Sequence, residues 1–209
     1  SGIPDYRDAD GGWKRDPPIT FQAFVTDEAA RRRYWARSLV GWRRFRAAKP
    51  NDTHLALARL EAQGRIELLV TQNVDRLHQT GGSRRVVDLH GRLDIVRCIG
   101  CDARLGRDAM QARLLAVNPA WPHIDAPDAP DGDADLDDVD SSAFRIPACT
   151  NCGGLLKPDV VFFGENVPRD RVDTAMRGLA RSDAMLIVGS SLMVYSGFRF
   201  ARAASEAGK

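Results

Sequence analysis

The stretch that decides the fold runs from residue 71 to residue 93 and reads Thr71-Gln-Asn-Val-Asp-Arg-Leu-His-Gln-Thr-Gly-Gly-Ser-Arg-Arg-Val-Val-Asp-Leu-His-Gly-Arg-Leu93. Short apolar runs at 66–70 and 86–89 are each typical of a strand buried in a parallel sheet. Ligands of open α/β sheets bind beyond the carboxyl ends of such strands, where Gln72, Asn73, Asp75 and His90 stand. The stretch therefore predicts a polar site built on a parallel sheet.

Each of these residues also has a simpler interpretation. Asn73 and Asp75 could do no more than shape a turn, and His90 could be a partly buried histidine with satisfied hydrogen bonds. For any one of these residues alone, the simpler interpretation is favoured. Because all of them converge at strand ends, a functional site is favoured for the set. Gly91 adds to this, because its missing side chain lets a ligand approach the imidazole.

Length and composition limit the class of protein. A chain of 209 residues, 44% of them hydrophobic, can build one large α/β domain with a small insertion. Its net charge of +2 predicts no nucleic-acid partner, and no apolar run has the length of a membrane span or the form of a secretory signal. We expect a globular, cytoplasmic monomer from a bacterium, or a mitochondrial protein if the source is eukaryotic.

Helices are predicted before the central stretch. Apolar side chains recur at spacings of three and four between residues 27 and 47, with arginines between them, and this helical module covers about 10–48. The arginines are interpreted as a solvated helix face rather than a site for an acidic partner. Asn51 can cap a further helix, which Gly64 ends, and His54 in its first turn is interpreted as structural.

The second half of the chain continues the alternation of strands and helices. We expect an apolar strand at 157–165 that returns to the main sheet, a helix at 169–181, and a buried strand at 184–189 that leads into Ser190 and Ser191. This order is the doubly wound pattern of a parallel, Rossmann-like α/β sheet. A strand that enters a glycine and two serines favours ribose or phosphate contacts, although the pattern is common.

The four cysteines of the chain form two pairs, Cys98 with Cys101 and Cys149 with Cys152. Two knuckles of this spacing complete a tetrahedral shell of four thiolates, which indicates one structural Zn²⁺ per chain with no open position for a substrate. Two disulfides are the competing interpretation, and they fit the paired spacing poorly. An acidic loop at 125–140 lies between the pairs, and its carboxylates are not in register for a calcium loop.

In combination, these motifs resemble the sirtuins, the NAD-dependent protein lysine deacylases. The resemblance covers nearly the whole chain and rests on Ser-Gly-Ile-Pro-Asp-Tyr-Arg at 1–7, Thr-Gln-Asn-Val-Asp at 71–75, Leu-His-Gly at 89–91, the four cysteines, Val-Val-Phe-Phe-Gly-Glu at 160–165 and Val-Gly-Ser-Ser-Leu at 188–192. Tyr-Trp-Ala-Arg at 34–37 and the long insertion between the cysteine pairs are most similar to the class II branch, whose animal member is mitochondrial.

The expected domain organisation follows from these assignments. Residues 1–94 and 155–209 form an NAD-binding, Rossmann-like domain that includes the helical module, and residues 95–154 form an inserted zinc-binding subdomain. Members of the family begin with a strand and a Gly-Ala-Gly turn before the first residue here, and they continue with another strand after the last. We therefore expect the chain to be truncated at both ends and the fragment to be inactive by itself.

The resemblance also implies roles for individual residues. His90 would be the catalytic base, and Asn73 and Asp75 would act in catalysis by holding the reacting ribose and amide together with Gln72. The other NAD contacts would come from Ile3, Pro4, Asp5, Tyr6 and Arg7 in one loop and from Gly189, Ser190 and Ser191 at the adenosine half. The backbone of an acyl-lysine protein or peptide would pair as an added strand with Val161, Phe163, Gly164 and Glu165.

Tyr34 and Arg37 are three residues apart, so on a helix they share a face. They could present a phenol and a guanidinium to an acyl group larger than acetyl that ends in a carboxylate. The rival interpretation, which is slightly favoured, is that Tyr34 packs in the core and Arg37 lies at the surface.

The implied reaction transfers the acyl group from lysine to ADP-ribose and releases nicotinamide, and a neutral imidazole accepts the proton of a ribose hydroxyl. Two other functions stay open. One is a protein mono-ADP-ribosyltransferase that uses the same site, and the other is a non-catalytic, zinc-stabilised binding module. Nicotinamide release that depends on an acyl-lysine peptide discriminates among the three.

Overall fold

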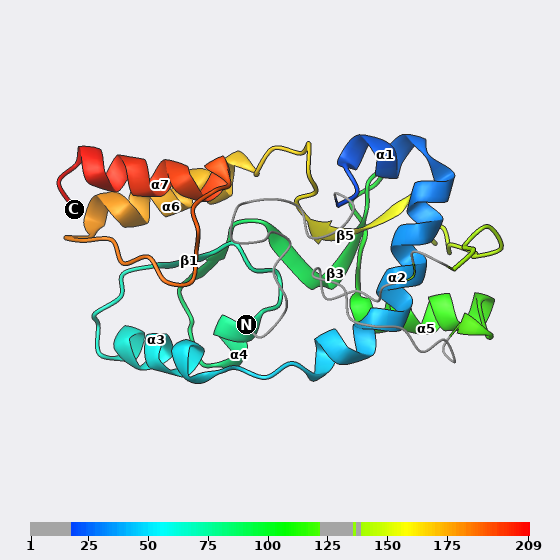
Figure 1. The fold of residues 1–209 in the computed structure, drawn as a ribbon, viewed down its shortest axis with the longest axis horizontal. Helices are drawn as coiled ribbons and strands as arrows, with labels where there is room; N and C mark the ends of the chain where they lie inside the picture. Colours follow the sequence, from blue (N-terminus) through cyan, green and yellow to red (C-terminus); the bar gives the residue numbers. More distant parts are fainter. Residues whose placement is uncertain (1–17, 122–135, 137–138) are drawn as a thin grey trace. The chain divides into compact units, whose positions relative to one another are not determined.

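The structure, a computed structural model, describes residues 18–121, 136 and 139–209 (Figure 1). The chain divides into two compact units. Unit 1 combines the chain up to Ala48 with Arg92–Glu165, and unit 2 combines Lys49–Gly91 with Asn166–Lys209. Each unit has its own small sheet and its own buried apolar cluster, so each has the core that a separate folding unit requires.

Unit 2 is built on two parallel strands. Strand β1 (Leu69–Thr71) pairs with β2 (Val86–Asp88), and the register places Leu69 opposite Val86 and Thr71 opposite Asp88. The helices of this unit are α3 (Asp52–Ala62), α4 (Leu77–Thr80), α6 (Arg169–Arg181) and α7 (Tyr195–Glu206). Helix α4 lies in the connection from β1 to β2, because parallel strands need a long crossover between them.

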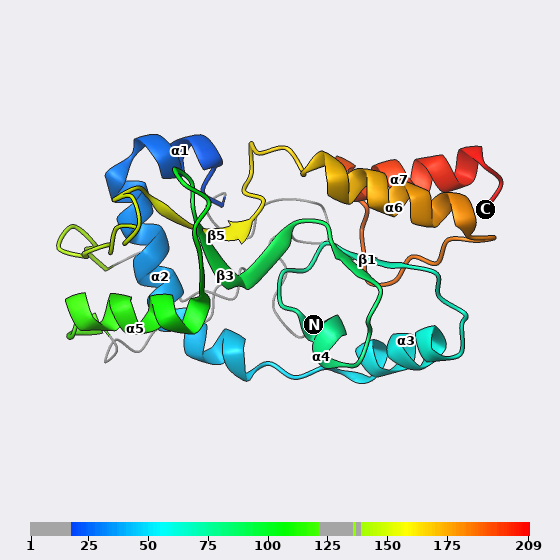
Figure 2. The ribbon, with the colours of Figure 1, turned by 180° about the vertical axis from the view of Figure 1, so that it is seen from behind.

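Helices α6 and α7 lie side by side when unit 2 is seen from either direction (Figures 1 and 2). Leu89, Ala175 and Phe200 form the buried core of the unit. Gly178 of α6 lies so close to Leu68 that a Cβ atom there would be 2.5 Å from the Leu68 Cδ2 atom. Helix α6 is therefore packed directly against the residue that precedes β1.

Unit 1 combines a three-stranded sheet with three helices. The strands β4 (Arg104–Gly106), β3 (Gly91–Cys98) and β5 (Leu156–Val160) are adjacent in that order, and β3 and β4 are antiparallel. The helices are α1 (Phe21–Thr26), α2 (Glu28–Ala47) and α5 (Arg107–Val117), and α2 contacts both of the others. Phe24, Trp35, Leu39, Met110 and Leu156 are among the side chains of one buried core. No helix in the described part of the chain is both long and apolar enough to cross a membrane.

The predicted starts of two helices are confirmed. Asp27 caps α2 by accepting a hydrogen bond from Ala29 N at 2.8 Å, and Asn51 caps α3 by accepting one from His54 N at 3.2 Å. The Nδ1 atom of the buried His54 accepts a hydrogen bond from Asn51 N at 3.2 Å, which completes a capping box. His54 is therefore structural.

Three expectations about strands are wrong. Residues 184–189 do not form a strand, since no described segment pairs with them and Leu186 is 72% exposed. The strand expected at 157–165 ends at Val160 and belongs to the sheet of unit 1 rather than to the parallel sheet. Val70 in β1 is 37% exposed, so this strand is not buried on both faces. An apolar run favours a strand, but the neighbouring strands decide its pairing and its burial.

The compact units do not follow the boundaries predicted at residues 94 and 155. Helix α2 packs against α1 and α5 and shares one core with them. The helical module therefore lies in the same unit as the cysteines, whereas the predicted organisation placed it in the NAD-binding domain. The division of the chain by function into a cofactor domain and a zinc subdomain stays a prediction.

A buried asparagine after α5 connects this helix to a distant part of unit 1. Asn118 Oδ1 accepts a hydrogen bond from Arg145 N at 2.8 Å, and Asn118 Nδ2 donates to Arg145 O at 2.8 Å and to Leu114 O at 2.9 Å. Beside it, the rings of Trp121 and Phe144 meet edge to face with their centroids 4.9 Å apart. These contacts hold the segment around Phe144 against the end of α5.

Candidate functional site

The best-defined polar cluster lies in unit 2 and is centred on His90. Strand β2 ends at Asp88, and His90 directly precedes Gly91, whose φ of 88° is a conformation that favours glycine. The His90 Nδ1 atom lies 3.2 Å from the carbonyl oxygen of Gln72, and the His90 Nε2 atom lies 2.8 Å from Ser196 Oγ. Both nitrogens of the ring are therefore held by hydrogen bonds.

These two contacts define where the imidazole carries its proton. A carbonyl oxygen only accepts hydrogen bonds, so we assign the proton of neutral His90 to Nδ1 and the free electron pair to Nε2. Burial lowers the pKa of His90, the hydrogen bond to the Gln72 carbonyl acts in the opposite direction, and the positive charge of Arg171 lowers it further. A neutral imidazole with its electron pair on Nε2 can accept a proton from a substrate near neutral pH.

Gln72 holds His90 through its backbone carbonyl, and its side chain contacts two segments that follow α6. Gln72 Nε2 donates a hydrogen bond to Ser190 Oγ at 3.2 Å. A Cβ atom on Gly197 would lie 2.7 Å from Gln72 Cδ, so a glycine is needed there for the amide to fit. The structure therefore brings together Gln72, His90 and Ser190, three residues of the predicted site.

Asn73 and Asp75 follow β1 as predicted, and their described contacts are local. The backbone N–H of Asn73 donates to Thr71 Oγ1 at 3.1 Å, and the Asn73 side chain is exposed. Asp75 Oδ1 accepts a hydrogen bond from Leu77 N at 2.9 Å and so helps to start α4. These contacts agree with the interpretation that both residues shape a turn, and they leave the second carboxylate oxygen of Asp75 for other contacts.

Two residues of this cluster were not predicted from the sequence. Asp88 pairs with Arg76 and accepts a hydrogen bond from Gln79 Nε2 at 2.9 Å, so it holds the turn before α4, where Arg76 has a left-handed φ of 63°. Its position directly before the Leu-His-Gly motif is a signal that could have identified it. Ser196 stands in no recognisable motif, and only the fold shows its contact with His90.

The structure describes some of the remaining cofactor residues and not others. Ile3, Pro4, Asp5, Tyr6 and Arg7 lie outside the described residues. Gly189 has a φ of 60°, and no atom lies within 4 Å of the place a Cβ would take, so a ligand can approach its backbone. Ser191 is exposed. The amides, hydroxyls and carboxylate of the predicted set are the groups that hydrogen-bond a ribose and a carboxamide, so these residues fit NAD.

The predicted substrate loop lies in unit 1, directly after β5. Phe163 forms a parallel bridge with Thr20, and its carbonyl oxygen accepts a hydrogen bond from Phe21 N at 2.8 Å. Gly164 has a φ of 84°, and a Cβ there would collide with the side chain of Gln22. Val161 is half-buried. One side of the loop is therefore already paired with residues of the same unit.

Glu165 ends this loop, and its carboxylate points back into the unit. Glu165 Oε2 accepts a hydrogen bond from Phe162 N at 2.7 Å and lies 2.8 Å from Lys157 Nζ. The Lys157 side chain is only 2% exposed, and its ammonium lies 4.5 Å from the centroid of the Phe162 ring. This buried ion pair, which the sequence did not reveal, fixes the shape of the loop.

Tyr34 and Arg37 lie on α2, as predicted. The Tyr34 ring packs against Phe24, Trp35 and Phe162 with centroid distances of 5.5, 5.4 and 5.3 Å. This packing agrees with the structural interpretation of Tyr34. Arg37 is half-buried.

The four cysteines meet in unit 1, with their sulfur atoms within 4.8 Å of one another. All four are free thiols, so neither disulfide of the competing interpretation is present. Cys98 is the last residue of β3, and Gly153, which follows Cys152, has the φ of 73° that a tight knuckle requires. The arrangement places four ligands around one point.

The charges of the thiols explain why this point suits a cation. Cys98 Sγ lies 3.4 Å from Cys152 Sγ, and Cys101 Sγ lies 3.8 Å from Cys149 Sγ, so four thiolates would repel one another strongly. The Asn151 amide donates to Cys101 Sγ at 3.4 Å and is the main cause that lowers the pKa of Cys101 to about 6. A dication removes the repulsion between the remaining thiolates. The four cysteines are therefore positioned to bind one zinc ion.

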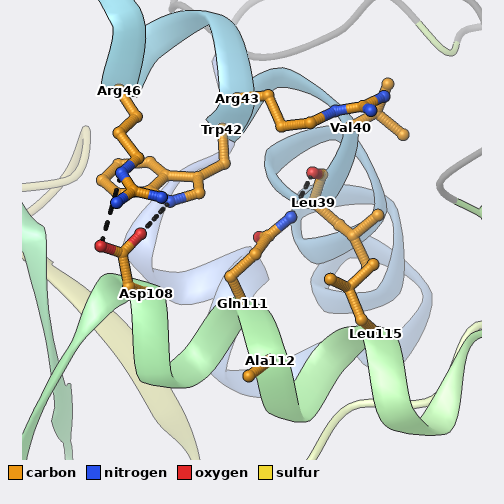
Figure 3. Close-up of a pocket in the computed structure, with 9 residues that line it drawn as sticks. All are labelled: Leu39, Val40, Trp42, Arg43, Arg46, Asp108, Gln111, Ala112 and Leu115. Carbon is orange, nitrogen blue, oxygen red and sulfur yellow. Dashed lines mark hydrogen bonds and ion pairs between the residues drawn. The ribbon is translucent and has the colours of Figure 1, made fainter.

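A cavity of about 420 Å³ lies between α2 and α5 of unit 1 (Figure 3). Trp42 Nε1 donates to Asp108 Oδ1 at 2.9 Å, and Arg46 Nε lies 3.5 Å from Asp108 Oδ2. Gln111 Nε2 donates to Leu39 O at 2.8 Å. None of the predicted site residues lines this cavity, and its polar groups join the two helices, so we interpret it as a feature of their packing.

Known proteins share both the sequence and the fold of this chain. The model of the Sir2 family matches residues 1–196. NAD-dependent protein deacetylase 2 of Bradyrhizobium diazoefficiens is 66% identical over 206 residues, which are 99% of this chain and 76% of that relative. NAD-dependent protein deacylase Sirt4 of Drosophila melanogaster is 49% identical over 204 residues, which are 95% of this chain and 65% of that protein. A solved structure of Sir2 with a p53 peptide and NAD⁺ has a TM-score of 0.72 at 28% identity and covers 99% of this chain and 72% of its own.

These matches confirm the Rossmann-like α/β fold expected from the central stretch, since the similarity to the solved structure extends over almost the whole chain. They also confirm the resemblance on which the assignment of the site residues rests. The chain belongs to the Sir2 family, the sirtuins.

Proposed function

We propose that the protein is an NAD-dependent protein lysine deacylase, which transfers an acyl group from lysine to ADP-ribose and releases nicotinamide. The observation that carries the proposal is the neutral imidazole of His90 at the carboxyl end of β2, with its electron pair on Nε2, in a chain of the Sir2 family. The relatives named above are an NAD-dependent deacetylase and an NAD-dependent deacylase, and the solved neighbour holds a peptide and NAD⁺.

Each residue of the cluster has a definite task in this proposal. Bound NAD supplies ADP-ribose as the acyl acceptor and nicotinamide as the leaving group. His90 Nε2 takes a proton from a ribose hydroxyl, and the Gln72 carbonyl keeps Nδ1 protonated and the ring in position. Gln72, Asn73 and Asp75 hold the nicotinamide half. The other contacts come from Ile3, Pro4, Asp5, Tyr6, Arg7, Gly189, Ser190 and Ser191.

The peptide substrate pairs with the loop formed by Val161, Phe163, Gly164 and Glu165. The bridge between Thr20 and Phe163 supports this, because Phe163 already takes part in strand-like pairing within unit 1. Main-chain hydrogen bonds make few demands on sequence, so many acylated proteins fit. Thiols that hold zinc and a nucleotide cofactor both suit a reducing compartment, and we place the protein in the cytoplasm.

A comparison of substrates that carry different acyl groups tests the proposed role of Arg37. If its guanidinium binds an acyl carboxylate, Arg37→Met lowers kcat/KM for succinyl and glutaryl peptides about 10-fold or more and leaves acetyl and long-chain acyl peptides unchanged. The exposed Arg33 on the same helix provides the control. Arg33→Met should leave kcat/KM unchanged for each of the four substrates. If acetyl-lysine is the best substrate and Arg37→Met keeps the ranking, the acid pocket does not exist.

The test of the proposed function is product accounting with the full-length protein, an acyl-lysine peptide and NAD⁺. Deacylation gives nicotinamide, free lysine and acyl-ADP-ribose in equal amounts, and only when the peptide carries an acyl group. His90→Ala should lower turnover by about 10²-fold or more and leave the zinc content unchanged, because His90 is proposed as a positioned general base. ADP-ribose transferred to protein would indicate the transferase instead, and no nicotinamide at all would indicate a binding module.

A further inference from the structure

The first turn of α7 touches the catalytic imidazole directly. Ser196 is the second residue of this helix, and its Oγ lies 2.8 Å from His90 Nε2. Gly197, the next residue, is buried against the Gln72 side chain, whose backbone carbonyl holds the other nitrogen of the same ring. The serine is therefore fixed by helix packing at the nitrogen that is proposed to act as the base.

The His90 Nε2 atom can accept a hydrogen bond from only one hydroxyl at a time. A neutral imidazole nitrogen without a proton has one electron pair and accepts one good hydrogen bond. Since Nδ1 carries the proton, the hydroxyl of Ser196 donates to that electron pair. A second hydroxyl cannot donate to Nε2 while Ser196 does so.

We propose that Ser196 is a positioning residue whose hydroxyl caps His90 Nε2 in the cofactor-free protein and is displaced by the ribose hydroxyl when the cofactor binds. The inference rests on the proposed function for the identity of the incoming hydroxyl. One hydroxyl replaces another, so the imidazole keeps the same tautomer and the same hydrogen-bond geometry before and after binding. The cofactor must break the contact between Ser196 and His90 to bind, and this contact therefore weakens the affinity of the protein for the cofactor.

The size of this effect follows from the net value of one hydrogen bond. A neutral intramolecular hydrogen bond that competes with water shifts an equilibrium by about 2- to 10-fold. Ser196→Ala should therefore lower the Kd for ADP-ribose, which carries the ribose hydroxyls without nicotinamide, by about 2- to 10-fold. The kcat should change by less than about 2-fold, since the displaced serine takes no part in the reaction.

The deciding experiment is ¹⁵N NMR of histidine-labelled protein with and without ADP-ribose. The chain has only four histidines, and His90→Ala identifies the signals of the His90 ring. In the free state, the His90 Nε2 signals of wild type and Ser196→Ala should differ, because Nε2 has lost its hydroxyl partner in the variant. In the bound state they should coincide. This free-state comparison needs no activity, so it separates failure of the inference from failure of the proposed function.

Two further variants make the result specific. Ser196→Thr keeps the hydroxyl and should behave as wild type in both the NMR spectrum and the Kd. Ser205→Ala changes an exposed serine on the same helix and should alter neither. Identical free-state Nε2 signals in wild type and Ser196→Ala would overturn the proposal, as would bound states that still differ. A kcat that falls about 10-fold at an unchanged Kd would also overturn it, because the hydroxyl would then be needed in the reaction itself.

Discussion

The buried ion pair beneath the substrate loop leads to a quantitative prediction for Glu165→Gln. Lys157 and Glu165 have side chains that are 2% and 18% exposed, and their charged atoms are 2.8 Å apart. Burial lowers the pKa of Lys157, and the carboxylate of Glu165 opposes this shift. Glutamine keeps the size of the side chain and one oxygen acceptor for Phe162 N, but it removes the negative charge. The variant therefore leaves the buried Lys157 ammonium without its paired carboxylate, and only the weaker influence of Asp159 remains to offset its charge.

Two limits define the expected loss of stability. Removing one partner of a buried pair costs about 3–5 kcal/mol. The loss cannot exceed the free energy of deprotonating Lys157 from its ordinary pKa of 10.5, which is about 5 kcal/mol at pH 7 and about 2 kcal/mol at pH 9. We therefore expect a loss of about 3–5 kcal/mol at pH 7 and of no more than about 2 kcal/mol at pH 9.

The sign of this pH dependence follows from proton binding. Without the Glu165 carboxylate, the folded-state pKa of Lys157 falls further below its value in wild type, so between these two pKa values the folded variant has lost a proton that folded wild type still holds. Stability of the variant relative to wild type therefore rises with pH in that window. Urea unfolding followed by tryptophan fluorescence measures it, because all four tryptophans of the chain belong to the segments of unit 1.

Two control variants separate burial from charge. Glu28→Gln removes a carboxylate that is 62% exposed and paired with Arg32, and it should cost less than about 1 kcal/mol. The double variant with Lys157→Met and Glu165→Gln leaves no unpaired charge and should recover most of the loss. A loss for Glu165→Gln below about 1 kcal/mol, or one that is equal at both pH values, would refute the reasoning.

Three other predictions concern the zinc site, helix α6 and a histidine pair. Chelation should remove one zinc ion per chain and change the tryptophan fluorescence of unit 1, and metal analysis with clearly less than one ion in folded protein would contradict the four-thiolate site. Gly178→Ala should lower the stability of α6 by about 1–3 kcal/mol, because the added methyl group overlaps Leu68, and hydrogen exchange in α6 should become faster. Gly106→Ala is the control, since a methyl group there enters open space and should not change hydrogen exchange in α6. Equal effects of the two variants would contradict the close contact. Burial lowers the pKa of both His54 and His78, whose rings lie 4.6 Å apart, so protons bind the unfolded state first and stability is lost as pH falls below 6.5. His78→Phe should make hydrogen exchange in α3 less sensitive to acid, and an unchanged pH slope would rule out this role.

The sequence predicted those features that depend on local chemistry. Asp27 and Asn51 start helices because their side chains bond backbone N–H groups within the next turn. The spacing of the cysteines predicted a common site because two knuckles of fixed geometry suffice to describe it. The position of His90 after β2 was also predictable, since the end of a strand is marked by local residues.

Other features depend on contacts between distant segments, which local patterns do not encode. Residues 184–189 have the composition of a buried strand, but a strand exists only where a neighbour pairs with it, and no described segment does. Nothing near Lys157 in the sequence indicates that Glu165 will neutralise it in the core, since lysine is common in exposed loops. Ser196 and His90 are far apart in the chain, and their contact requires the packing of α7 through Gly197 on Gln72.

The hydrogen bonds between Asn118 and Arg145 also bear on how the two cysteine pairs come together. Cys101 and Cys149 are 48 residues apart in the sequence. Asn118 lies after the first pair and Arg145 just before the second, so their hydrogen bonds and the Trp121–Phe144 ring contact shorten the path between the pairs to less than half of that length. Each halving of a loop lowers the entropic cost of closing it by about 0.6 kcal/mol. A contact that is remote from the sulfur atoms therefore favours the assembly of the four-thiol site.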